Sequence, residues 1–139
     1  YYGSYTCADG KFISIGPIEP QFYAKFRDLL GVADDPDFDA QKNPAAWPAL
    51  KEKLTHIFLT KTRDEWDAIF AGTDACVAPI LDWDEAPQHP HNVARETFFE
   101  LDGVVQPAPA PKFSRSAAAM PQRSEMVSFE DVAKGWGIE

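Results

Sequence analysis

Prolines limit how far any helix or strand of this chain can run. Twelve of its 139 residues are proline. Because proline fixes φ and has no backbone N–H, it is tolerated in the first turn of a helix, in an edge strand or in extended chain. Pro20 and Pro48 therefore predict helix starts and Pro79 predicts an edge strand, whereas the prolines within 107–111 predict an extended, polyproline-like segment.

The apolar spacing between these prolines predicts an α+β fold. The strand-forming segments 4–7 and 11–15 are joined through an Asp-Gly pair at 9–10, which tolerates the positive φ of a hairpin turn. Short apolar runs at 75–81 and 97–101 predict further strands. We therefore expect a small antiparallel sheet of about three strands, flanked by helices and followed by the proline-rich segment.

Apolar side chains at helical spacing predict three helices in the first half of the chain. The first ends at Gly31, and the third begins with a capping box in which Thr62 and Glu65 satisfy each other's free amides. The acidic stretch 34–43 is expected to be a surface loop, and a short last helix is expected near 129–136. The apolar faces of the three helices are Phe22, Phe26, Leu29, Leu30, Trp47, Leu50, Leu54, Phe58, Trp66, Ile69 and Phe70.

Charge and composition argue against two classes of partner. The formal net charge is −9, and no run of Lys and Arg is interleaved with aromatic residues, so a nucleic-acid backbone would be repelled. No window approaches the roughly 20 apolar residues of a membrane helix, and the N-terminus lacks the pattern of a signal peptide. We expect a soluble, intracellular protein. The chain starts at Tyr1 without an initiator Met, which suggests that it was processed or excerpted.

Glu19 is the most unusual of the polar residues. It precedes Pro20 at a predicted helix N-terminus, where Ser, Thr, Asp or Asn would cap better. The helix dipole favours its ionised form, and a carboxylate held there could orient a histidine or accept a relayed proton. The simpler interpretation from the residues alone is a generic acid that the dipole stabilises.

The remaining candidates favour structural roles. His89 and His91 flank Pro90 and could share a metal, but no third ligand is evident, which favours surface or packed histidines. Cys7 and Cys76 lie far apart in strand-like apolar settings, which favours buried reduced thiols. Asp74 is interpreted as a turn-capping acid. The sequence contains no P-loop, nucleophile elbow or paired-cysteine zinc pattern, so we expect no metal and no cofactor.

A series of short motifs extends from Tyr2 to about Arg115. They are Tyr5-Thr6, Ala8-Asp9-Gly10, Ile15-Gly16-Pro17-Ile18-Glu19-Pro20-Gln21-Phe22-Tyr23, Trp66, Ile69-Phe70, Gly72-Thr73-Asp74-Ala75-Cys76-Val77-Ala78-Pro79-Ile80-Leu81, His91-Asn92, Arg95 and Pro109-Ala110-Pro111. In this order they resemble the small domain of the α-methylacyl-CoA racemases, which are members of CoA-transferase family III.

The resemblance implies a two-domain isomerase of fatty acid metabolism, of which this chain is the smaller part. Members have a large Rossmann-like CoA-binding domain and a small α+β domain, and two chains interlock into a homodimer. The implied reaction is racemisation at the α-carbon of 2-methyl-branched acyl-CoA thioesters through an enolate. A His and an Asp of the large domain carry it, and neither His89 nor His91 matches that position. Glu19 matches the glutamate expected to hydrogen-bond the catalytic His of the partner subunit.

The resemblance also leaves alternatives open. A family III acyl-CoA transferase would act through a large-domain Asp, but such enzymes tend to have a glycine-rich loop where this chain has the segment 17–20, which argues for a racemase. A non-catalytic interaction module is the alternative from another class.

The resemblance further predicts how the chain is divided. We expect residues 1–106 to form the small domain and 107–139 to be an extended linker and tail that returns toward the absent large domain. The fragment alone is expected to be inactive, with acyl-CoA as a substrate bound through the large domain. A cytoplasmic location is expected, although some relatives work in mitochondria or peroxisomes.

Overall fold

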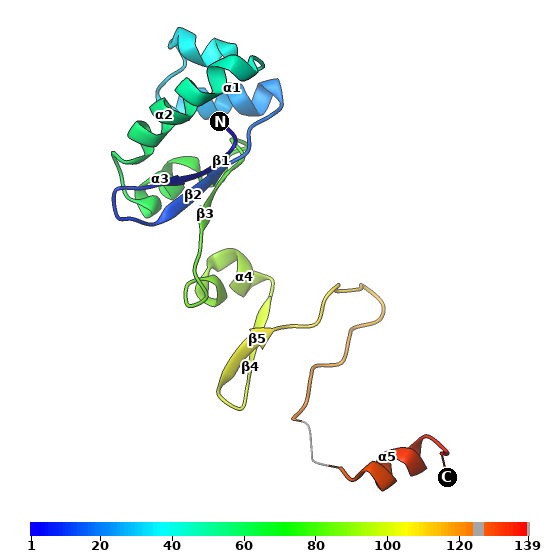
Figure 1. The fold of residues 1–139 in the computed structure, drawn as a ribbon. Helices are drawn as coiled ribbons and strands as arrows, with labels where there is room; N and C mark the ends of the chain where they lie inside the picture. Colours follow the sequence, from blue (N-terminus) through cyan, green and yellow to red (C-terminus); the bar gives the residue numbers. More distant parts are fainter. Residues whose placement is uncertain (124–126, 139) are drawn as a thin grey trace. The chain divides into compact units, whose positions relative to one another are not determined.

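A three-stranded antiparallel sheet organises the first of two units (Figure 1). The computed structural model describes residues 1–123 and 127–138, and the two units are Tyr1–Leu81 and Asp82–Glu139. The sheet has the order β1-β2-β3, so that Pro79 lies in an edge strand as predicted. Its strands are β1 (Gly3–Thr6), β2 (Phe12–Ile15) and β3 (Val77–Ile80).

The three predicted helices of this unit are confirmed. Pro20 and Pro48 both lie in first turns, where a missing N–H costs nothing. Gly31 ends the first helix with a left-handed φ of 79°. The third helix has the predicted capping box, in which Thr62 and Glu65 bond each other's backbone amides. The helices are α1 (Pro20–Leu30), α2 (Trp47–Phe58) and α3 (Arg63–Phe70).

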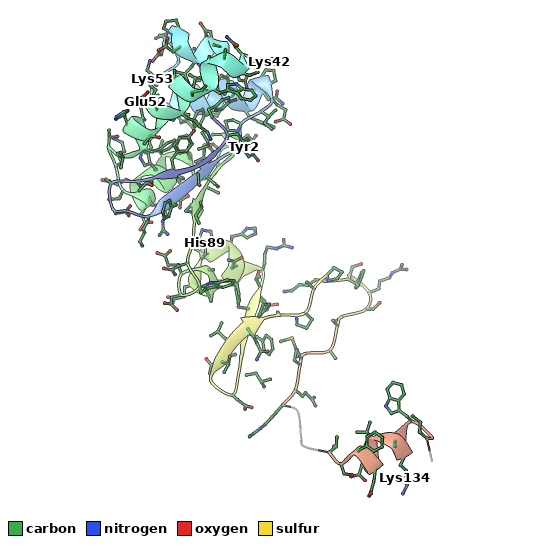
Figure 2. The ribbon with its side chains drawn as sticks, viewed as in Figure 1. Tyr2, Lys42, Glu52, Lys53, His89 and Lys134 are labelled. Atoms are coloured by element: carbon green, nitrogen blue, oxygen red, sulfur yellow. The ribbon has the colours of Figure 1, made fainter. Side chains whose placement is uncertain are left out.

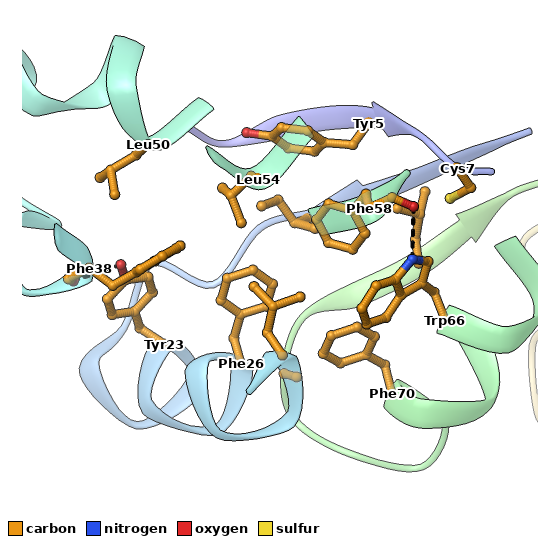
Figure 3. Close-up of a cluster of buried hydrophobic side chains, with 14 residues drawn as sticks. Tyr5, Cys7, Tyr23, Phe26, Phe38, Leu50, Leu54, Phe58, Trp66 and Phe70 are labelled. Carbon is orange, nitrogen blue, oxygen red and sulfur yellow. Dashed lines mark hydrogen bonds between the residues drawn. The ribbon is translucent and has the colours of Figure 1, made fainter. Parts of the chain in front are cut away.

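Aromatic side chains fill the core between the sheet and the helices (Figure 3). Helix α2 contacts β1, and α3 contacts β2 and β3. Phe58 is fully buried, with its ring centroid 5.2 Å from that of Trp66 and 5.3 Å from that of Tyr5. The indole Nε1 of Trp66 donates a hydrogen bond to the Phe58 carbonyl oxygen at 2.9 Å. Packing and hydrogen bonding thus join α2 and α3.

Tyr23 and Phe38 are buried in the core, which the prediction did not include. Tyr23 is buried, whereas Phe22 is only half-buried, because the Tyr23 hydroxyl finds an acceptor in the Phe38 carbonyl oxygen at 2.8 Å. The segment 34–43 is not simply a surface loop. It contains the 3-10 helix η1 (Pro36–Ala40), which buries Phe38 to 1% exposure. A single phenylalanine among acids has no periodicity and therefore gave no signal in the sequence.

The second unit contains a two-stranded hairpin. The strand predicted at 97–101 is confirmed, but its partner includes Pro107, which was expected in the extended segment. A two-residue turn with positive φ at Asp102 and Gly103 connects the strands. The division into 1–106 and 107–139 stays a prediction, and residues 124–126 and 139 lie outside the described residues. The elements are η3 (Ala86–Gln88), α4 (Pro90–Ala94), β4 (Phe98–Leu101), β5 (Val104–Pro107) and α5 (Phe129–Gly135).

The two cysteines differ in exposure, and the expectation of a buried thiol is wrong for Cys76. Cys7 lies in the core at 1% exposure, and burial, followed by the nearby Asp9 carboxylate, raises the pKa of its thiol. Cys76 is exposed. It has a left-handed φ of 53° in the turn before β3, so it does not follow the side-chain alternation of the strand.

We expect only one thiol of the native protein to react with a maleimide. Cys76 is accessible, whereas Cys7 is shielded and its raised pKa keeps the thiolate scarce. Intact-mass spectrometry should show one adduct in native buffer and two in urea, and Cys76→Ser should remove the native adduct. Two rapid native adducts would contradict the burial of Cys7.

Candidate functional site

Glu19 occupies the N-cap position of α1, as predicted. Its backbone is extended, with φ of −70° and ψ of 145°, and its carbonyl oxygen accepts the amide of Tyr23 at 2.9 Å. The side chain is exposed and makes no capping hydrogen bond. The carboxylate therefore lies beside the positive end of the helix dipole and remains available to a donor from outside the chain.

The segment that leads to Glu19 is fixed on both sides. Pro17 is fully buried, and the amide of Gly16 donates to the Cys76 carbonyl oxygen at 2.9 Å. On the other side, Nε2 of Gln41 donates to the carbonyl oxygens of Ile18 at 2.9 Å and Pro17 at 3.4 Å. These bonds hold the backbone of the N-cap residue without using its carboxylate, which is the arrangement that a positioned functional group requires.

A groove of about 920 Å3 borders this segment. Trp47 was expected in the core, but it is 40% exposed and lines the groove, because its Nε1 donates to the Gln41 carbonyl oxygen at 2.9 Å. Tyr2 also lines it, and a Cβ at Gly16 would lie only 3.0 Å from the Tyr2 ring, so glycine permits this close approach. The lining residues are Tyr1, Tyr2, Ile18, Gln41, Lys42, Pro44, Trp47, Pro48 and Lys51.

The other candidate residues have structural roles or none. His91 is exposed, and Nδ1 of the half-buried His89 accepts the amide of His91 at 3.3 Å at the start of α4. The prediction of surface or packed histidines is therefore confirmed. The turn before β3 is capped by the Thr73 hydroxyl, which accepts the Ala75 amide at 3.4 Å, rather than by Asp74. Within residues 1–123 and 127–138, no three His, Cys, Asp or Glu side chains are grouped to hold a metal.

The sequence identified Glu19 but missed the groove. The groove residues come from the chain start, the segment before α1 and the beginning of α2, and these are brought together only by the tertiary fold. Trp47 is exposed at the start of α2, and no pattern in the sequence distinguishes it from the buried aromatic residues.

Among the described helices, none is both long and apolar enough to cross a membrane.

The comparisons with known proteins agree on one family. The chain is 44% identical over 120 residues to the mouse α-methylacyl-CoA racemase and 42% identical over 112 residues to the human one, covering 85% and 80% of this chain. It spans only 31% and 29% of the length of those relatives. A crystal structure of a CaiB/BaiF family protein from Brucella suis has the same fold, with a TM-score of 0.65, 22% identity, and coverage of 99% of this chain and 37% of that one. The model of CoA-transferase family III matches residues 1–126, and the chain therefore belongs to this family.

Proposed function

We propose that this chain is the small domain of an α-methylacyl-CoA racemase, an isomerase that interconverts the two configurations at the α-carbon of 2-methyl-branched acyl-CoA thioesters. The observation that carries the proposal is the 44% identity to the mouse racemase over 85% of the chain. In the full-length protein, the acid–base pair is a His and an Asp of a larger CoA-binding domain. One of them removes the α-proton and the other returns a proton to the opposite face of the enolate.

Glu19 is proposed to position the catalytic His of the partner subunit in an interlocked homodimer. Its carboxylate is exposed and makes no capping bond, while its backbone is held by Pro20 and the Gln41 contacts to the preceding residues. A carboxylate that accepts Nδ1–H of an imidazole leaves Nε2 to exchange the substrate proton, and it raises the basicity of the ring. Glu19 is thus a positioning residue, since it acts through the histidine.

The segment before Glu19 favours racemase over acyl-CoA transferase. The glycine-rich loop of an acyl-CoA transferase can move with the acyl intermediate of that enzyme. In this chain, by contrast, Pro17 is buried and the Ile18 carbonyl is hydrogen-bonded. Two prolines within 17–20 further restrict the backbone. This rigidity suits a site that holds one fixed proton-transfer geometry.

Deuterium exchange at the α-carbon tests this proposal. In D2O, the full-length protein that contains this chain is expected to incorporate deuterium at C2 of a 2-methylacyl-CoA and to equalise the two configurations. The 139-residue chain alone should catalyse no exchange, and mixing it with a separately produced large domain should restore it. Acyl transfer to an added carboxylate without C2 exchange would instead support the transferase. Exchange by the chain alone would overturn the placement of the acid–base pair.

A further inference from the structure

The peptide units just before Glu19 are held by a glutamine from another segment of the chain. Nε2 of Gln41 donates to the Ile18 carbonyl oxygen at 2.9 Å and to the Pro17 carbonyl oxygen at 3.4 Å. A carboxamide nitrogen carries two N–H groups, so one side chain can satisfy both acceptors. Because a peptide unit is planar, the Ile18 carbonyl lies in one plane with the amide nitrogen and Cα of Glu19. The Gln41 side chain therefore fixes the plane from which Glu19 extends.

The other side of Glu19 is held by α1. Pro20 follows it with a restricted φ, and the Glu19 carbonyl oxygen accepts the Tyr23 amide at 2.9 Å. With the backbone held on both sides, the carboxylate keeps only its side-chain torsions. The support from α1 is made by the backbone, whereas that from Gln41 is made by a side chain. A substitution at Gln41 can therefore remove one support and leave the helix intact.

Gln41 is itself fixed by the elements around it. It is half-buried and directly follows η1, whose Phe38 is buried in the core. Lys53 of α2 donates to the Asp37 carboxylate of η1 at 2.8 Å (Figure 2 labels Lys53). Nε1 of Trp47, at the start of α2, donates to the Gln41 carbonyl oxygen at 2.9 Å. The side chain that holds the Glu19 segment is thus anchored to α2 and to the core, as precise positioning of a functional group requires.

We propose that Gln41 is a positioning residue for racemisation, which sets the place of the Glu19 carboxylate by holding the peptide units before it. This role rests on the proposed function, in which Glu19 acts through a histidine of the partner subunit. A displacement of about 1 Å in a catalytic constellation can cost about 100-fold in rate. Because Gln41 acts through Glu19, its removal should change kcat and the pKa of the histidine, and KM should change little.

Gln41→Met in the full-length protein tests this role. Methionine is similar in length and flexible, but it has no N–H to donate to the Ile18 carbonyl. We expect kcat for racemisation to fall about tenfold. The acidic limb of the kcat profile should move to lower pH, because a loosely held anion raises the pKa of the histidine less. Gln88→Met is the matched control, since Nε2 of Gln88 also donates to a backbone carbonyl, that of Asp84 at 3.2 Å, and it should leave kcat and the pH profile unchanged.

A Glu19→Gln background separates positioning from general damage to the fold. Gln41→Met should lower kcat by less than about twofold in this background, because residues that act as one unit are not additive. Gln41→Asn, whose carboxamide is too short to reach both carbonyls, should repeat the loss in the wild-type background. Wild-type kcat in both Gln41 variants, or an equal fold-loss in the two backgrounds, would overturn this role. Both results leave the racemase proposal standing if Glu19→Gln alone lowers kcat, whereas a Glu19→Gln enzyme with the wild-type kcat would overturn the roles of both residues.

Discussion

Phe58→Ala is expected to reduce the free energy of unfolding of the first unit by about 3–5 kcal/mol. Phe58 is fully buried and its ring packs between those of Tyr5 and Trp66. Truncation removes the transfer energy of the ring and leaves a cavity that three separate elements would have to close. Since small domains have a total stability of about 5–15 kcal/mol, the variant should unfold at a markedly lower urea concentration.

Leu59→Ala is the matched control for this substitution. Leu59 is the next residue in the chain and is 46% exposed, so its truncation should change stability by only about 0.5 kcal/mol. Urea titrations followed by near-UV circular dichroism report the packing of the aromatic core in both variants. Equal midpoints for Phe58→Ala and Leu59→Ala would contradict the core in Figure 3.

Helices α1, α2 and α3 could be predicted because their starts depend on local chemistry. A proline at the first turn and a Thr–Glu capping box act through backbone groups only a few residues away. The same is true of the hairpin, whose turn has Gly10 at a φ of 78°. Such signals depend little on the rest of the chain and are therefore readable in a single sequence.

The errors arose where tertiary contacts decide the outcome. Phe38 lies in the core cluster together with Tyr23 of α1, whose hydroxyl donates to the Phe38 carbonyl oxygen, and no spacing within residues 34–43 indicates this. Cys76 is exposed because one residue of left-handed backbone interrupts the apparent strand. Strand β5 was missed because Pro107, at its end, was interpreted as extended chain. An edge position makes the proline compatible with pairing.

The candidate site likewise combines a residue that local sequence signals identify with a groove that only tertiary contacts form. Glu19 could be identified because a glutamate before a helix-starting proline is a poor cap, which is a local anomaly. Its proposed partner, however, is not part of this chain. The groove required the fold, since Lys42, Trp47 and Lys51 meet Tyr2 and Ile18 only after α2 has packed beside the sheet.

Glu19→Gln in the full-length protein is expected to lower kcat for racemisation by about 100-fold, within the range known for groups that support a proton-transfer histidine. A carboxamide has nearly the shape of the carboxylate and can still accept one hydrogen bond, but it has no charge to stabilise the imidazolium. KM should change little, because Glu19 is not proposed to touch the substrate. Without the neighbouring anion, the pKa of the histidine falls, and the acidic limb of the kcat profile should move to lower pH.

Two further variants decide whether this loss reflects positioning or damage to the fold. Glu52→Gln makes the same chemical change at an exposed position of α2 (Figure 2) and should leave kcat and the pH profile unchanged. Glu19→Asp keeps the charge on a shorter side chain and should recover part of the activity together with the original acidic limb. Because the Glu19 carboxylate makes no capping bond, Glu19→Gln should lower the free energy of unfolding by no more than the dipole contribution of about 0.3–1 kcal/mol, and Glu19→Asp and Glu52→Gln should change it less. A Glu19→Gln enzyme with the wild-type kcat and pH profile would show that the carboxylate has no part in the proton relay, and the exposed N-cap would then be only an acid stabilised by the dipole of α1.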